Sequence, residues 1–213
     1  MIGQRFHYRW NYFLMASNDF VVMLPNRRGL PGFGQDWNDA ISKDWGGQPM
    51  SDILACTDEM SKDPYVDENK IAAIGIEKGG QMVYQAIKND VGLNAVAVFN
   101  TPTDLIGLYN DSISARKKVF EEKLGGTPSE IEEKYIAKSS YYWPEKIDSP
   151  LLILHYEESK NVKSIQAKKL VNKFNKIGYK DYKAIINSDM DWEFVINRSI
   201  EWIREKTEIN LEM

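Results

Sequence analysis

IAAIGIEKGGQ, residues 71–81, joins an apolar run to a cluster of glycines. The run is typical of a buried β-strand, and the residues after the glycines repeat apolar side chains at helical spacing. Gly75, Gly79 and Gly80 surround the junction. This pattern predicts a sharp strand-to-helix turn, the nucleophile elbow G-x-S-x-G. Glu77 stands where the serine belongs, so the sequence predicts the turn without its nucleophile.

Apolar runs and helical patterns alternate along the rest of the chain. We expect strands at 20–24, 71–76, 94–99, 150–155 and 182–186, and helices at 8–17, 49–62, 114–124, 128–137, 162–177 and 192–206, with a further helix through Ala86. Alternation over short connections indicates right-handed βαβ units and a mostly parallel sheet flanked by helices. Residues 1–213 contain no linker and no internal repeat, which predicts a single α/β domain.

Composition narrows the class of protein. The chain has 213 residues, 43% of them hydrophobic and 27% charged, as in ordinary globular proteins. A net charge of -4 argues against a nucleic-acid partner, and a single cysteine excludes an internal disulfide. The first 17 residues lack the apolar core of a secretory signal, and no run of 18 apolar residues occurs. We therefore expect a soluble protein without a membrane partner, cytoplasmic as expressed, and the sequence does not assign a compartment.

Several other stretches accompany the elbow in a fixed order. They are LPNRRG at 24–29, GFG at 32–34, DWGG at 44–47 followed by Asp52, PLLILH at 150–155, and Trp192. With the G-x-x-x-G-G elbow, they make the chain similar, from about Tyr8 onward, to the C-terminal catalytic domain of the prolyl oligopeptidase family, which includes the dipeptidyl peptidases. The resemblance implies an α/β-hydrolase fold with a serine on the elbow. It also implies an aspartate after the next-to-last strand and a histidine after the last. The large N-terminal propeller of that family has no counterpart here, so we expect one partial hydrolase domain.

The three catalytic positions of that family are all changed. The serine corresponds to Glu77, the aspartate falls near Ser159, and the histidine falls on Asp191. Serine hydrolysis needs a hydroxyl nucleophile, an imidazole base and an orienting carboxylate. The backbone N–H of Lys78 could remain as half of an oxyanion hole. The sequence therefore predicts an inactive pseudo-hydrolase, or a fragment, on a serine-peptidase scaffold.

A strand of the family fold is also absent from this sequence. The strand whose following loop carries the second oxyanion donor should precede Tyr8, but residues 1–7 show no such pattern. That strand lies in the family between the strand at 20–24 and the elbow strand. We expect the sheet to lack its first strands. Because unpaired buried backbone is costly, we expect rearranged pairing or strand donation from a second chain, which would form a homo-oligomer.

A first alternative is new carboxylate chemistry at the elbow. Glu77 and Asp191 should approach each other, and paired carboxylates can divide acid and base roles. With the acidic residues Glu157, Glu158 and Asp189 nearby, they could hold Ca²⁺ or Mg²⁺. Neutralisation by Lys78 and Lys160 is the simpler interpretation. We therefore expect no metal and no cofactor.

A second alternative is a peptide-binding module that keeps the substrate cleft. The aromatic residues that could line such a cleft are Tyr109, Tyr141, Tyr142 and Trp143. Aromatic side chains at such positions belong more often to a hydrophobic core. Arg27 and Arg28 pose a similar choice between anion binding and local pairing. We favour pairing because a loop rich in Gly and Pro needs internal hydrogen bonds.

Overall fold

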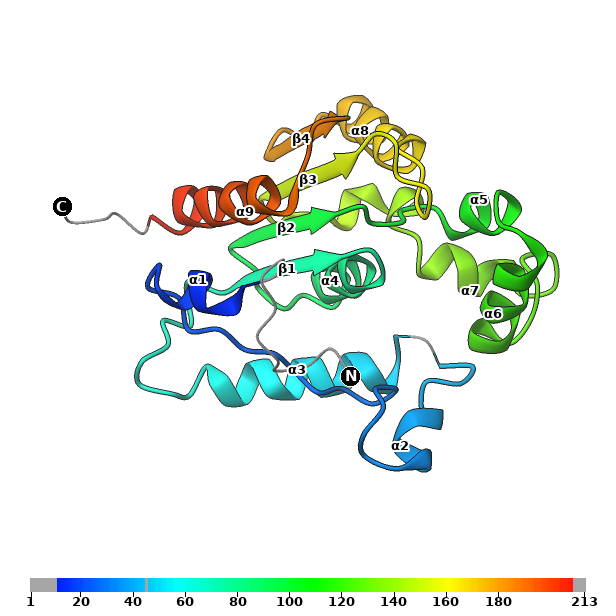
Figure 1. Ribbon diagram of the computed structural model, residues 1–213, viewed down its shortest axis with the longest axis horizontal. Helices are drawn as coiled ribbons and strands as arrows, with labels where there is room; N and C mark the ends of the chain where they lie inside the picture. Colours follow the sequence, from blue (N-terminus) through cyan, green and yellow to red (C-terminus); the bar gives the residue numbers. More distant parts are fainter. Residues whose placement is uncertain (1–10, 45, 209–213) are drawn as a thin grey trace.

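The computed structural model describes residues 11–44 and 46–208. Its centre is a parallel sheet in the order β1-β2-β3-β4 (Figure 1). The strands are β1 (Ala72–Ile76), β2 (Ala95–Phe99), β3 (Leu151–Tyr156) and β4 (Tyr182–Asn187). The register runs straight across the sheet, as Gly75 pairs with Val98, Val98 with Ile153, and Ile153 with Ala184. The parallel α/β architecture predicted from the alternating pattern is confirmed.

Most helices lie close to where the periodicity places them, but the short helices at 35–39 and 105–110 were not predicted. They are α1 (Tyr12–Ala16), α2 (Gln35–Asp39), α3 (Gln48–Met60), α4 (Lys78–Lys88), α5 (Leu105–Asn110), α6 (Ser114–Leu124), α7 (Glu132–Ala137), α8 (Ile165–Ile177) and α9 (Trp192–Thr207), with short 3₁₀ turns η1 (Ser140–Tyr142) and η2 (Pro144–Lys146). The helix expected at 128–137 begins only at Glu132, and the start of the helix expected at 8–17 lies outside the described residues. No helix of the described ranges has the length and apolar character needed to cross a membrane.

The two faces of the sheet pack against different helices. Along β2, Val96 and Val98 pack in one hydrophobic cluster with residues of α4 and α8. Ala95, Ala97 and Phe99 point the other way and pack with residues of α9. This alternation follows from the period of two along a strand. Both faces are covered, which is why β2 and β3 read as continuous apolar runs.

A small helical group lies beyond the carboxyl ends of β1 and β2. It consists of α5, α6 and α7 and appears at the right of Figure 1. Leu105, Leu108, Phe120, Leu124 and Tyr135 form its own hydrophobic cluster. The group therefore stands beside the turn where β1 enters α4, and it provides one wall of the site described below.

The prediction of a strand at 20–24 is wrong, because these residues form no strand. The side chains of Phe20 and Val22 pack instead beside Ile74 of β1, in a cluster with Met15 and Ile196. A strand exists only where a neighbour accepts its backbone hydrogen bonds, and the neighbour that the family fold would supply is absent from the described residues. Apolar burial was predicted correctly for this segment, but its backbone pairing was not. Within the described residues, β1 is an edge strand.

The loop after this segment is held by Arg28. Its Nη2 lies 2.6 Å from Oδ1 of Asp52, its Nε lies 2.9 Å from Oδ2, and its backbone N–H also donates to Oδ2. Nη1 donates to Gln48 at 2.8 Å. These contacts tie the loop to α3. Local pairing, which we favoured over anion binding for this arginine, is confirmed.

Candidate functional site

The elbow turn is present and is built as its glycines require. Glu77 has φ +47° and ψ −112°, a backbone conformation that is sparsely populated for residues other than glycine. A Cβ atom on Gly75 would lie 2.4 Å from the Cα of Gly80, and one on Gly80 would lie 1.9 Å from Oγ1 of Thr101. Only glycine fits at these two positions. The sharp turn predicted for β1 into α4 is therefore confirmed.

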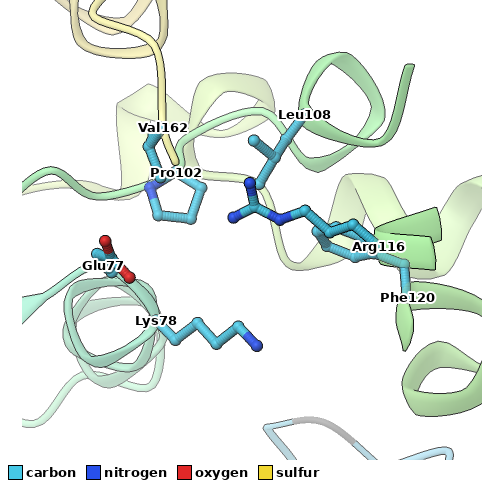
Figure 2. A pocket seen from close by; sticks show the side chains of 7 residues that line it. All are labelled: Glu77, Lys78, Pro102, Leu108, Arg116, Phe120 and Val162. Atoms are coloured by element: carbon cyan, nitrogen blue, oxygen red, sulfur yellow. The ribbon is translucent and has the colours of Figure 1, made fainter. Parts of the chain in front are cut away.

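Glu77 projects from this turn toward a small pocket (Figure 2). Its backbone N–H donates to the carbonyl oxygen of Phe99 at 2.8 Å, which anchors the turn to β2. Its Oε1 accepts a hydrogen bond from Nδ2 of Asn161 at 3.1 Å. The pocket holds about 20 Å³, which is room for one water molecule, and is lined by Glu77, Lys78, Pro102, Leu108, Arg116, Phe120 and Val162.

Positive charge surrounds the one carboxylate of this pocket. Partial desolvation lowers the pKa of the Lys78 ammonium, and the nearby charges of Lys123 and Arg116 lower it further, whereas Glu77 opposes them. Arg116 reaches over from α6 and donates from Nη1 to the carbonyl oxygen of Asn161 at 2.7 Å. The elbow thus combines one carboxylate with several positively charged side chains.

Ser159 and Asp191, the other two residues that the resemblance sets at triad positions, have structural contacts of their own. Ser159 lies in the loop after β3, where its Oγ accepts from the backbone N–H of Val162 at 3.5 Å. Asp191 is the N-cap of α9, and its Oδ1 accepts from the backbone N–H of Phe194 at 2.8 Å. Both follow the carboxyl ends of strands, at the same edge of the sheet as Glu77. Neither residue lines the elbow pocket, and no hydrogen bond joins any two of the three.

The one histidine that the structure describes is not placed to act as a base. His155 lies within β3, and its side chain is fully buried. Its Nε2 lies 2.8 Å from the carbonyl oxygen of Val162, while Nδ1 has no hydrogen-bond partner among the described residues. Burial lowers the pKa of the imidazole. The other histidine of the sequence, His7, lies outside the described residues.

Carboxylates near the ends of β3 and β4 do not assemble into a metal site. Among residues 11–44 and 46–208, no group of three or more His, Cys, Asp and Glu side chains is arranged to hold a metal ion. Glu157 pairs with Lys168 at 2.8 Å, and Glu158 accepts from the hydroxyl of Tyr156 at 3.2 Å. Of these acidic residues, Glu157 alone has a cationic partner among the described residues, and that partner is Lys168 in place of the expected Lys78 or Lys160.

The four aromatic residues considered as a cleft lining lie elsewhere. Tyr109 packs in the helical cluster and donates to Glu121 at 2.5 Å. Trp143 is buried in the main core, and Tyr141 packs beneath the ammonium groups of Lys169 and Lys173. Tyr142 is 38% exposed beside Tyr141. None of the four lines the elbow pocket or the neighbouring pocket around Lys160.

Two residues of the elbow region have no signal in the sequence. Arg116 belongs to a helix whose many charged residues are typical of a solvent-exposed surface. Asn161 belongs to a polar loop without a motif. Asn161 contacts Glu77, and Arg116 contacts Asn161, because the sheet order places the loop after β3 and the helices after β2 beside the end of β1. Contacts of this kind depend on topology and not on local sequence.

Comparison with known proteins agrees with this geometry. The chain matches the prolyl oligopeptidase family over residues 6–208. The chain belongs to this family. Its members are serine peptidases on a hydrolase scaffold.

Two relatives illustrate the match. Dipeptidyl-peptidase 5 of Porphyromonas endodontalis is 32% identical over 213 residues, which covers 95% of this chain and 30% of that protein. Dipeptidyl-peptidase 5 of Porphyromonas gingivalis is 34% identical over 171 residues, or 78% of this chain and 25% of that protein. The chain therefore spans less than a third of the length of these relatives.

Solved structures show the same fold at lower identity. The acylaminoacyl peptidase of Pyrococcus horikoshii superposes with a TM-score of 0.75 at 21% identity, covering 88% of this chain and 32% of that one. A puromycin hydrolase superposes with a TM-score of 0.74 at 15% identity, covering 88% of this chain and 30% of that one. The α/β-hydrolase fold expected from the resemblance is confirmed.

Proposed function

We propose that this chain is a pseudo-hydrolase of the prolyl oligopeptidase family, in which the elbow is kept as a structural turn and hydrolysis is lost. The observation that carries the proposal is the side chain at the apex of the turn. Glu77 keeps the strained backbone of a nucleophile elbow but presents a carboxylate, and that carboxylate accepts a hydrogen bond from Asn161.

The chemistry around Glu77 supports this conclusion. A carboxylate can attack a carbonyl, but turnover of the resulting anhydride needs a base to activate water. His155 is buried within β3, and Asp191 accepts the hydrogen bond that caps α9. Loss of one member of a catalytic triad costs several powers of ten in rate, and loss of all three leaves little beyond oxyanion stabilisation. Among the residues that the structure describes, the backbone amide at Lys78 is the candidate donor that remains for that role.

An active-site probe tests the proposal directly. A fluorophosphonate reacts with activated serine hydroxyls, so we expect no labelling of this chain under conditions that label an active serine peptidase fully. The Glu77→Ser variant is the sharper test, because it restores the hydroxyl without restoring an imidazole. We expect that variant to remain unlabelled as well. Stoichiometric labelling of any serine in the unaltered chain would overturn the proposal.

A further inference from the structure

A second cavity lies beside the elbow pocket, between the residues that join α5 to α6 and the loop after β3. It holds about 30 Å³, which is room for about two water molecules. This Lys160 cavity is lined by Leu108, Asp111, Ser112, Arg116, Lys160, Asn161, Lys163 and Gln166. Glu77, Ser159 and Asp191 are not among the lining residues, so the cavity is separate from the positions that the family resemblance marks.

Two contacts hold the walls of the Lys160 cavity together. Nη1 of Arg116 donates to the carbonyl oxygen of Asn161 at 2.7 Å, and Nζ of Lys163 lies 3.0 Å from Oδ2 of Asp111. Each contact joins the segment from α5 to α6 to the loop after β3. Because the enclosed space is so small, the charged side chains around it are within reach of one small ligand.

Gln166 is the buried polar residue of this lining, with 3% of its surface exposed. Its Oε1 accepts from the backbone N–H groups of Thr103 and Asp104 at 3.0 and 2.7 Å, which fixes the amide in place. Nε2 donates one N–H to the carbonyl oxygen of Asp104 at 3.1 Å, and its other N–H has no acceptor among the described residues. A buried donor without an acceptor is costly, so the lining favours a ligand that carries oxygen atoms.

Positive charge exceeds negative charge around the Lys160 cavity. Lys163 and Asp111 neutralise each other, which leaves Arg116 and Lys160. In the described part of the chain, Arg116 uses one of its five side-chain N–H groups, and Lys160 makes no ion pair or side-chain hydrogen bond. Two positive charges of the lining are therefore without a partner.

A carboxylate outside the lining limits this excess only partly. Oε1 of Glu77 accepts from Nδ2 of Asn161 at 3.1 Å, so Glu77 touches the back of the wall that Asn161 forms. Glu77 lines the elbow pocket and not the Lys160 cavity. A ligand in the Lys160 cavity therefore meets the two cations directly and Glu77 only across Asn161.

A phosphate group matches this lining better than a carboxylate does. It carries about 1.5 to 2 negative charges at neutral pH and presents three strong acceptor oxygens. The guanidinium of Arg116 offers a fork of N–H donors to two such oxygens, and the ammonium group of Lys160 adds a point charge. A carboxylate would leave one positive charge uncompensated. We infer that the Lys160 cavity binds a phosphate group, as inorganic phosphate or as the end of a phosphate monoester, between Arg116 and Lys160. Such binding does not depend on whether hydrolysis has been lost.

Calorimetric titration of the 213-residue chain in a phosphate-free buffer of low ionic strength tests this inference. The probes are inorganic phosphate and methyl phosphate, with acetate as the singly charged control. We expect at least one of the two phosphates to bind with Kd on the order of 1 mM, within the range that so few non-hydrogen atoms allow. We expect acetate to bind at least tenfold more weakly. Stronger binding of inorganic phosphate would identify a site for the free ion, and equal or stronger binding of methyl phosphate would identify a site for an ester.

Four variants assign the binding to these residues, with circular dichroism confirming the fold of each. Arg116→Gln and Lys160→Gln should each weaken binding of the better phosphate at least tenfold. Asp111→Asn removes the negative charge of the lining and should strengthen binding at least threefold, an effect that a damaged fold does not produce. Lys62→Gln is the matched control, because it makes the same change of charge at an exposed ion pair on α3 and should leave binding unaltered.

Several results would overturn the inference. Absence of heat with both phosphates at twenty times the expected Kd is one, and acetate binding as strong as phosphate binding is another. Weaker binding by the Asp111→Asn variant would contradict the assigned charge balance. Equal losses in Lys62→Gln and Lys160→Gln would show that phosphate responds to the net charge of the chain and not to this cavity.

Discussion

Gly80 lies so close to Thr101 that a Cβ atom at position 80 would fall 1.9 Å from the Thr101 Oγ1. This contact presses the first turn of α4 against the residues that follow β2. A Gly80→Ala substitution gains helix propensity but forces this junction apart, and overpacking of a buried contact costs about 1–3 kcal/mol. We expect the free energy of unfolding to fall by about that amount, measured by urea denaturation.

Gly79 provides the matched control for this prediction. It lies on the same helical turn, but a Cβ atom there would meet nothing within 4 Å. Gly79→Ala should therefore leave stability unchanged or raise it by up to about 1 kcal/mol, through helix propensity alone. Equal destabilisation by the two substitutions would show that the close approach of Gly80 to Thr101 is not what requires glycine.

Asp191 yields a prediction about what its side chain contributes at the start of α9. Its Oδ1 accepts the backbone N–H of Phe194, so Asp191→Ala removes the N-cap of α9 and should cost about 0.5–2 kcal/mol of stability. Asp191→Asn keeps an oxygen at the same place and should cost no more than a few tenths of a kcal/mol. Thermal or urea unfolding measures both. Equal losses in the two variants would mean that the charge of Asp191, and not its capping oxygen, stabilises the fold.

Much of the fold could be predicted because its signals are local. One short stretch predicts a strand, a turn and a helix, through its apolar run at 71–76 and its glycines at 75, 79 and 80. Each of these elements appears where it was expected. The Phe20–Leu24 segment has an equally apolar sequence but forms no strand. An apolar run specifies burial, whereas a strand also needs a partner, and no property of residues 20–24 reveals whether a partner exists.

The candidate site was harder to predict for a related reason. The position of Glu77 followed from the motif, but its contacts did not. Asn161 lies 84 positions away in sequence and meets Glu77 only after β3 has taken its place in the sheet. The small and charged residues of α6 likewise gave no indication that the side chain of Arg116 would line the elbow pocket. Long-range polar contacts follow from topology, so they become visible only in the structure.

The salt bridge between Arg28 and Asp52 should contribute more to stability than the salt bridge between Lys62 and Asp58. Asp52 accepts hydrogen bonds from the guanidinium and from the backbone N–H of Arg28, and these contacts lower the pKa of its carboxyl. Its side chain is only 18% exposed. Asp52→Asn should therefore cost about 1–3 kcal/mol, since hydrogen bonds to charged groups are involved. Asp58→Asn removes an exposed partner of Lys62 on the same helix and should cost less than about 1 kcal/mol.

Urea denaturation at neutral pH compares these two variants. The carboxyl pKa of Asp52 is lower in the folded than in the unfolded chain, so its contribution is present at neutral pH and is lost as the pH falls through the folded value. The difference between the unaltered chain and Asp52→Asn should therefore shrink in acid. A difference that is the same at pH 7 and pH 3 would contradict the charge-based explanation.

The exposed edge of β1 predicts an association between copies of the chain. β1 pairs only with β2 in the described residues, and an unpaired strand edge is a template for a further strand. We expect a dimer formed through this edge, with a mass that rises toward twice the monomer value as concentration increases. Light scattering coupled to size-exclusion chromatography measures this. A monomer at every concentration, with the fold intact by circular dichroism, would exclude strand donation.

The buried histidine predicts a loss of stability in weak acid. Burial holds the pKa of His155 below the ordinary 6.5, so the unfolded chain takes up a proton more readily than the folded one. Stability from neutral His155 is therefore complete above pH 6.5. It declines as the pH falls below 6.5 toward the folded pKa, by at most about 1.4 kcal/mol per pH unit. Protonation would also add a proton to Nδ1, for which the described residues provide no acceptor.

Urea unfolding between pH 5.5 and pH 8 measures this slope against a His155→Gln variant. The amide of Gln can donate to the carbonyl oxygen of Val162 as Nε2 does, but it does not titrate in this range. We expect the unaltered chain to lose stability below pH 6.5 and the variant to be lower in stability but nearly independent of pH. His7 is common to both proteins, so its titration cancels in the comparison. Parallel curves for the two proteins would show that another group is responsible for the acid sensitivity.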